Sequence, residues 1–164
     1  MTTTATRVPD ATALERLQII QNSDSVALVG VSANPIRSSN FVASYLVRTP
    51  FRTYPVNPAY DEVLGLKTFD TLADLPEAPD IVDVFRRHDA IPGVVVEALE
   101  VGAKGVWFQL GHRHDEAAQK AVDAGLLVVQ DRCLKIEHAR FSGRLHLAGF
   151  NTGVVSSKRR RPIN

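Results

Sequence analysis

The sequence predicts an α/β fold with a doubly wound, mostly parallel sheet of about five to six strands and helices on both faces. Residues 26–29 form an unbroken apolar run, which suits a strand buried on both faces of a parallel sheet. Strand patterns then alternate with helical patterns along the chain, as in βαβ units. A helix, a glycine and a strand follow one another twice in the second half, around Gly102 and Gly125. The length of 164 residues favours one domain.

Six segments are expected to be strands, and four to be longer helices. The strands are expected at residues 26–31, 51–56, 65–69, 80–85, 105–110 and 126–130, with a further short edge strand at 145–147. The helices are expected at residues 10–21, 38–49, 89–102 and 114–124. The candidate N-caps of the first three are Asp10 or Thr12, Ser38 or Ser39, and Asp89, and the fourth helix starts at His114 or Asp115. The second helix has one apolar face, made of Phe41, Val42, Tyr45 and Leu46.

Asp83 is an acid inside an otherwise apolar strand. A lone buried carboxylate is costly, so we expect Asp83 on an edge face or paired with a cation such as Arg86 or Arg87.

Composition and charge limit the classes of protein. Residues 1–9 are expected to be a disordered leader, residues 10–140 one domain, and residues 141–164 a C-terminal extension with a basic tail. The net charge is +1, but residues 158–161 are all basic, so the remainder is net negative and does not suit nucleic acid. This tail is expected to be solvated; the alternative is that it reaches a phosphate or an acidic partner. One cysteine and no apolar run of membrane-spanning length favour a reducing, cytoplasmic setting without a membrane span.

Polar and cationic residues follow the predicted strands at their carboxyl ends. In a parallel sheet these ends meet at one edge, where ligands bind. The residues are Ser32, Asn34, Arg37, Asn57, Arg86, Arg87, His88, Gln109, His112, His114, Asp131, Arg132, Cys133 and Lys135. A helix N-terminus accepts phosphate and Arg37 adds a fork of donors, so the excess of cations predicts a polyphosphate ligand.

Two other kinds of site are weighed against this one. The dinucleotide fingerprint needs three glycines, and here only Gly30 is present; the first acid after the second strand is Asp61, past the turn. His112 and His114 lack a carboxylate ligand at useful spacing, so they are expected to be loop histidines and no metal is expected. Cys133 is either a packed thiol or, if exposed beside cations, a reactive one.

Five segments in order carry a specific resemblance. They are residues 26–39 (VALVGVSANPIRSS), 54–58 (YPVNP), 80–87 (DIVDVFRR), 102–111 (GAKGVWFQLG) and 131–137 (DRCLKIE). Together they resemble the stand-alone CoA-binding protein family of small bacterial proteins, which is similar to the N-terminal CoA-binding domain of the succinyl-CoA synthetase α-subunit. The resemblance covers about residues 23–137, and residues 141–153 look like a C-terminal extension of some members.

The resemblance implies a Rossmann-like fold that binds the 3′-phospho-ADP end of coenzyme A (CoA) at the strand-end crevice. By resemblance, the residues that cradle phosphates would be Gly30, Ser32, Asn34, Arg37 and Ser39. Those lining the nucleotide pocket would be Val56, Asn57 and Pro58, with Phe85, Arg86 and Arg87 beside the nucleotide or its phosphates. The pantetheine arm would run near Gln109, Cys133 and Lys135.

The function that follows is a cytoplasmic, non-catalytic CoA or acyl-CoA binding protein. The related synthetases carry a separate phosphohistidine domain, so ligase activity is not implied. The alternatives are a nucleotide-dependent oxidoreductase, a thiol enzyme using Cys133, or a regulatory subunit of a separate acyl-CoA ligase or acyltransferase. Oligomeric state stays open, with a homodimer as one option.

Overall fold

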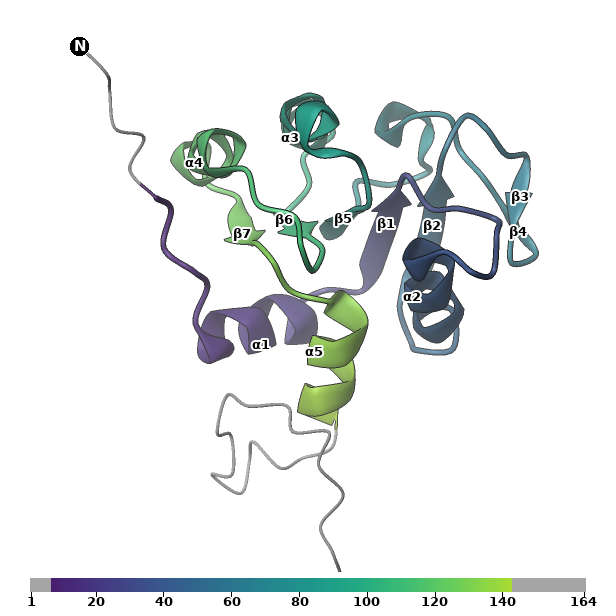
Figure 1. Cartoon of the computed structure of the whole chain (residues 1–164), viewed down its shortest axis with the longest axis horizontal. Coiled ribbons are helices and arrows are strands. Elements are labelled where there is room, and N and C mark those ends of the chain that lie inside the picture. The colour runs from purple at the N-terminus through teal and green to yellow at the C-terminus, as the bar shows by residue number, and fades with distance from the viewer. Residues whose placement is uncertain (1–6, 143–164) are drawn as a thin grey trace, which may run out of the picture.

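A five-stranded parallel sheet forms the centre of the molecule (Figure 1). The computed structural model describes residues 7–142. The strands are β1 (Ser25–Val29), β2 (Arg52–Val56), β5 (Ile81–Val84), β6 (Gly105–Phe108) and β7 (Leu127–Val129). Their order is β2-β1-β5-β6-β7, which is doubly wound, so the predicted fold class is confirmed.

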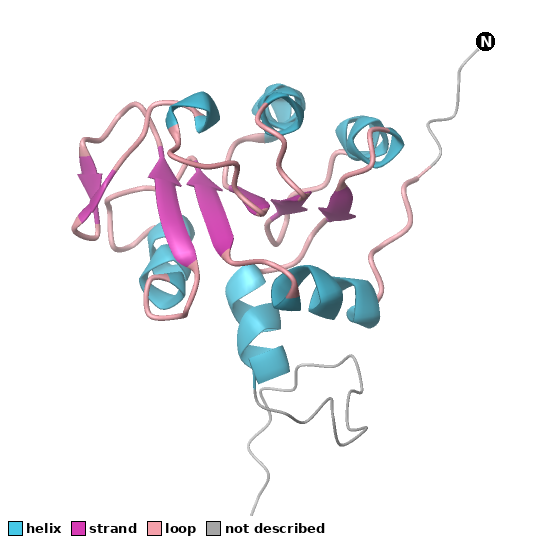
Figure 2. Cartoon of the chain, turned by 180° about the vertical axis from the view of Figure 1, so that it is seen from behind, coloured by secondary structure: helices cyan, strands magenta, loops and turns pink. Residues whose placement is uncertain are grey.

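Helices cover both faces of the sheet (Figures 1 and 2). One face carries α3 (Ile91–Glu100) and α4 (Asp115–Asp123), and the other carries α1 (Ala13–Gln21), α2 (Ser38–Leu46) and α5 (Leu134–Ser142). Two short 3₁₀ turns are present: η1 (Leu72–Asp74) precedes β5, and η2 (His88–Ala90) links β5 to α3. Among the described residues, no helix is long and apolar enough to cross a bilayer.

The core under α3 and α4 is mainly apolar. Strand residues such as Val84 and Phe108 pack against Ile91, Val95 and Ala118, all fully buried. Removing this surface from water is the main stabilising contribution of this face.

The core under α1, α2 and α5 mixes apolar and polar groups. Trp107 is fully buried there, and its indole Nε1–H donates to the backbone oxygen of Arg132 at 2.8 Å. Arg16 of α1 pairs with Glu137 of α5 at 2.8 Å, and both side chains are buried. Helix α1 also packs closely against β6. A Cβ on Gly105 would lie 2.5 Å from Ile19 Cδ1, so a larger residue at this position requires neighbouring atoms to move.

One of the three predicted N-caps, Thr12, is confirmed and two are wrong; the helix expected from His114 or Asp115 starts at Asp115, with His114 as its N-cap. Thr12 accepts from the backbone N–H of Glu15 in a capping box, and His114 accepts from Ala117 N–H. The N-cap of α2 is Arg37, without a side-chain bond, and that of α3 is Ala90, because a 3₁₀ turn containing Asp89 precedes it.

Four further expectations on the fold need correction. Phe41 is 63% exposed, so it is not part of the buried face of α2. The strand expected at residues 65–69 is only β4 (Leu66–Lys67), in an antiparallel hairpin with β3 (Glu62–Val63). Asp83 lies on the central strand and not at an edge; it is fully buried, and no ion pair of Asp83 is found within residues 7–142. Helix α5 was not expected at all, and the strand at 145–147 and the tail lie outside the described residues.

Candidate functional site

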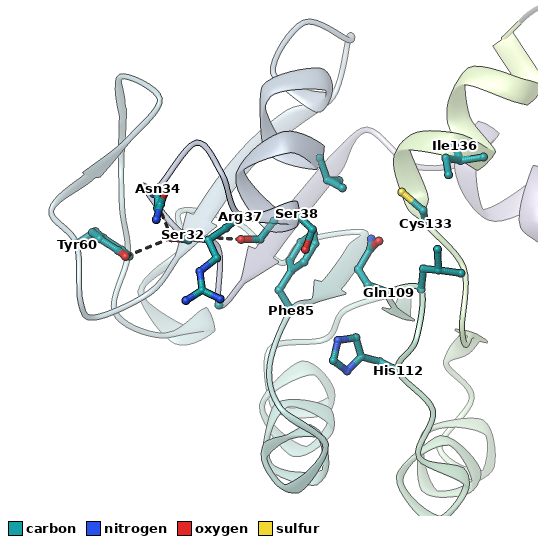
Figure 3. Close-up of a pocket in the computed structure, with 14 residues that line it drawn as sticks. Ser32, Asn34, Arg37, Ser38, Tyr60, Phe85, Gln109, His112, Cys133 and Ile136 are labelled. Carbon is teal, nitrogen blue, oxygen red and sulfur yellow. Dashed lines mark hydrogen bonds between the residues drawn. The ribbon is translucent and has the colours of Figure 1, made fainter. Parts of the chain in front are cut away.

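A cavity of about 600 Å³ opens at the carboxyl edge of the sheet (Figure 3). Its walls come from the segment after β1, the start of α2, the ends of β5 and β6, and the start of α5. Strand β1 lies between β2 and β5, so the chain winds away in opposite directions on its two sides. Ligands of doubly wound sheets bind at such a switch point. The lining residues are Gly30, Ser32, Asn34, Arg37, Ser38, Ser39, Val42, Tyr60, Phe85, Gln109, Leu110, His112, Cys133 and Ile136.

The β1–α2 segment is held in shape by its own hydrogen bonds. Ser39 Oγ accepts from the N–H of Ser32 at 3.0 Å, and Ser32 Oγ accepts from the N–H of Asn34 at 3.1 Å. Asn34 Oδ1 in turn accepts from the N–H of Ile36 at 3.0 Å. Asn40 Nδ2 donates to the carbonyl of Ser32 at 2.9 Å. Local side-chain bonds of this type fix turns, so this wall of the cavity is formed without help from a ligand.

Gly30 is required at the start of this segment for two separate reasons. Its φ is +87°, a conformation that favours glycine. A Cβ there would also lie 3.1 Å from Arg86 Cδ and 3.2 Å from the carbonyl oxygen of Phe85. The chain therefore turns from β1 into the cavity wall only with glycine at this position.

Positive charge gathers at the mouth of the cavity near the β1–α2 segment. Arg37 is the N-cap of α2 and is exposed, and within residues 7–142 no carboxylate lies within ion-pair distance of it. The first N–H groups of α2 have no helical partner and carry the positive end of the helix dipole. This end of the cavity suits an anion such as a phosphate.

The other end of the cavity is largely apolar and carries one fixed amide. Leu110, Cys133 and Ile136 line the cavity, and Figure 3 shows Cys133 and Ile136 at the end away from Arg37. Gln109 is buried and donates through Nε2 to Oδ1 of Asp83. Burial raises the pKa of Asp83 to about 8, because a charged carboxylate at this fully buried position on β5 would be poorly solvated. Within the described chain, Oδ2 of Asp83 has no hydrogen-bond partner.

The structure brings eight of the fourteen predicted site residues to the cavity wall. They are Gly30, Ser32, Asn34, Arg37, Ser39, Phe85, Gln109 and Cys133. Their roles toward a ligand stay predictions.

The other six predicted site residues do not line the cavity. Val56 belongs to the core, and Asn57 is buried and donates to the carbonyl of Val31 at 2.9 Å. Pro58 and Arg87 are exposed. Arg86 packs beside Gly30, and Lys135 places Nζ 4.0 Å from the ring centroid of Phe41.

Several lining residues were not predicted as site residues. They are Ser38, Val42, Tyr60, Leu110, His112 and Ile136. Tyr60 lies in the loop between β2 and β3, with its hydroxyl 3.3 Å from Ser32 Oγ, and no sequence signal marks it. Leu110 and His112 lie in the segment that follows β6, and this position after a strand could have marked them as site residues.

Two of the histidines near this edge stack on each other. His88 and His114 have ring centroids 4.4 Å apart. Across residues 7–142, no group of three or more His, Cys, Asp or Glu side chains is placed to hold a metal ion.

The sequence matches the CoA binding domain family over residues 24–139. The chain belongs to this CoA-binding family. It is 39% identical over 122 residues to the uncharacterized protein YneT of Bacillus subtilis, covering 74% of this chain and 90% of that one. A solved hypothetical protein from Pyrococcus horikoshii has a TM-score of 0.78 and 39% identity, covering 81% of this chain and 94% of that one.

This CoA-binding family member also resembles part of a larger class of enzyme. It is 28% identical over 89 residues to an ADP-forming acetate–CoA ligase of Methanocaldococcus jannaschii. That match covers 54% of this chain but only 13% of the ligase. The likeness therefore concerns one part of the ligase.

Proposed function

We propose that this protein binds CoA or an acyl-CoA in the cavity, with the phosphates at the β1–α2 segment, and does not itself catalyse a reaction. The observation that supports this most is the cation and dipole at one end of a 600 Å³ cavity, with no carboxylate paired to Arg37 in the described chain. Membership of the CoA-binding family names the ligand class that fits this end.

The cavity also has the polarity that CoA requires along its length. Hydroxyls and N–H groups near Ser32 and Ser39 suit the phosphates. Phe85, Leu110 and Ile136 suit the less polar pantetheine arm, and the Gln109 amide offers a hydrogen bond to one of its amides.

Calorimetric titration with CoA, dephospho-CoA and NAD tests the proposal. We expect CoA to bind, dephospho-CoA to bind more weakly because it lacks the 3′-phosphate, and NAD to bind least. Tight NAD binding without CoA binding would refute the proposed ligand.

Arg37→Gln tests the phosphate end directly. Loss of a charge-assisted hydrogen bond of about 1.5–3 kcal/mol predicts a Kd for CoA raised at least about tenfold. Arg48→Gln is the matched control, since Arg48 is exposed, follows α2 and does not line the cavity. Equal affinities for both variants would reject this placement of the phosphates.

A second candidate function is suggested by the place of Cys133 in the cavity wall. Its thiolate would attack the disulfide of oxidised CoA, forming a protein–CoA disulfide and releasing one reduced CoA. Intact-mass analysis after incubation with CoA disulfide should show one added CoA that is lost on reduction. The adduct should be absent in Cys133→Ser, and its absence in the unchanged protein would dismiss this candidate.

A further inference from the structure

A second, smaller cavity of about 240 Å³ adjoins the first. Leu110, Cys133 and Ile136 line both cavities, so these three side chains form a shared wall. The shared wall belongs to the apolar end of the larger cavity, away from Arg37 (Figure 3). The smaller cavity is completed by Arg16, Arg132, Glu137 and Arg140.

The smaller cavity has more positive than negative groups. Its single carboxylate, Glu137, is within ion-pair distance of two arginines: Arg16 at 2.8 Å and Arg140 at 3.5 Å. The third arginine, Arg132, forms no ion pair with Glu137. Three guanidinium groups around one carboxylate leave a net positive charge in a partly enclosed space, which favours an anion.

Arg132 is the arginine best placed to bind that anion. Its guanidinium makes one weak hydrogen bond, at 3.3 Å to the backbone oxygen of Asp131, and no ion pair of Arg132 is found in the described chain. Asp10, whose pKa Arg132 helps to lower, is paired with Arg113. The guanidinium of Arg132 therefore keeps its donors for a ligand.

The backbone of Arg132 is anchored independently of its side chain. Its N–H donates to the carbonyl of Phe108 at 3.4 Å, and its carbonyl accepts from Trp107 Nε1 at 2.8 Å. A substitution of the side chain leaves both bonds in place.

We propose that the smaller cavity receives the terminal carboxylate of an acyl group, so that the preferred ligand is the CoA thioester of a dicarboxylic acid. This inference rests on the proposed function, which puts the thioester end of the ligand at the shared wall. The methylene chain lies along Leu110 and Ile136, and the carboxylate binds Arg132. A neutral acyl chain of the same length has no carboxylate to bind the guanidinium of Arg132.

Titration with glutaryl-CoA and pentanoyl-CoA tests this inference, because both acyl chains have five carbons and only the first ends in a carboxylate. We expect glutaryl-CoA to bind at least about tenfold more tightly, the value of one charge-assisted hydrogen bond. Arg132→Gln should abolish the difference, and Arg48→Gln should preserve it.

The possible results separate the two proposals. If CoA binds but glutaryl-CoA and pentanoyl-CoA bind equally, the carboxylate subsite is rejected and the proposed function stands. If the preference persists in Arg132→Gln, the carboxylate binds elsewhere and the assignment to the smaller cavity is overturned. If none of the three CoA compounds binds, the proposed function fails and this inference fails with it.

Discussion

The two faces of the sheet differ in what they bury. The face under α3 and α4 buries mainly apolar side chains, such as Val95 and Phe108, and its buried Gln130 is an uncharged amide that bonds to Asp115 of α4. The face under α1, α2 and α5 also buries the Arg16–Glu137 ion pair and Asp83. Apolar burial is stabilising, whereas a buried charge is costly unless it is paired.

This difference separates stability from binding. Helices α2 and α5 line the larger cavity, and α1 and α5 line the smaller one. All three helices belong to the polar face, and neither α3 nor α4 contributes a lining residue. The apolar face therefore carries the stability that lets the other face hold costly polar groups near a ligand.

The largest expected effect comes from breaking the ion pair between α1 and α5. Arg16→Met leaves buried Glu137 without its closer partner, and we expect the free energy of unfolding to fall by about 3–5 kcal/mol. Urea denaturation measures this change. The double variant Arg16→Met, Glu137→Met should recover most of the loss, because no unpaired buried charge remains. A loss below about 1 kcal/mol in the single variant would show that this buried pair contributes no more than an exposed salt bridge does.

A comparable but purely apolar loss is expected on the opposite face. Ile91→Ala removes a fully buried side chain under α3, and the free energy of unfolding should fall by about 2–5 kcal/mol. Leu14→Ala, at an exposed position on α1, is the control and should change it little. CoA affinity of the folded Ile91→Ala protein should be unchanged, and weaker binding would show that the faces are not separate.

Asp83 should make stability depend on pH. Its pKa is raised from 3.8 to about 8 in the folded protein, so between these values the folded state holds a proton that the unfolded state has lost. The free energy of unfolding should therefore fall as pH rises, by about 2–3 kcal/mol from pH 5.5 to pH 7.5. Denaturation across this range measures the slope.

Asp83→Asn removes the titrating group and should flatten that slope, with the largest gain in stability at the highest pH. Asp70→Asn, at an exposed position, should leave the slope as it is. An unchanged slope in Asp83→Asn would assign the pH dependence to other groups.

The smallest expected change in stability is at Gly30. Gly30→Ala forces a left-handed backbone on alanine and should cost about 1–2 kcal/mol. Its effect on binding should be larger, because it displaces Arg86 and the start of the β1–α2 segment. Gly93→Ala, inside α3 with open space around it, is the matched control and should be neutral or stabilising. CoA affinity equal to that of the unchanged protein would contradict the role of Gly30 in shaping the cavity.

The fold was predictable because strand and helix patterns alternate and each is punctuated by glycine or a turn. Helix α5 was not predicted because it has only two buried apolar residues, Leu134 and Phe141, and its remaining buried side chain, Glu137, is charged. A charged residue that is buried through a partner 121 positions away leaves no local signal. The prediction for Asp83 was wrong for the same reason, because its environment is set by neighbouring strands that are distant in sequence.

Part of the candidate site was predictable from position after a strand. That rule found Ser32, Arg37 and Gln109, because the carboxyl ends of parallel strands meet. It could not find Tyr60 or Ile136, which reach the cavity from the loop between β2 and β3 and from a helix that was not predicted. Nor could it tell that Asn57 turns inward to hold the backbone of Val31.

Trp107 is the single tryptophan of the chain, and its position makes it a built-in fluorophore for the cavities. The indole is fully buried, and its N–H is bonded to the carbonyl of Arg132, next to Cys133 in the shared wall. If the proposed ligand moves that wall, we expect the polarity at the indole nitrogen to change and the emission to shift. Binding and unfolding can thus be followed optically on the unlabelled protein, with one signal for the core and the site together.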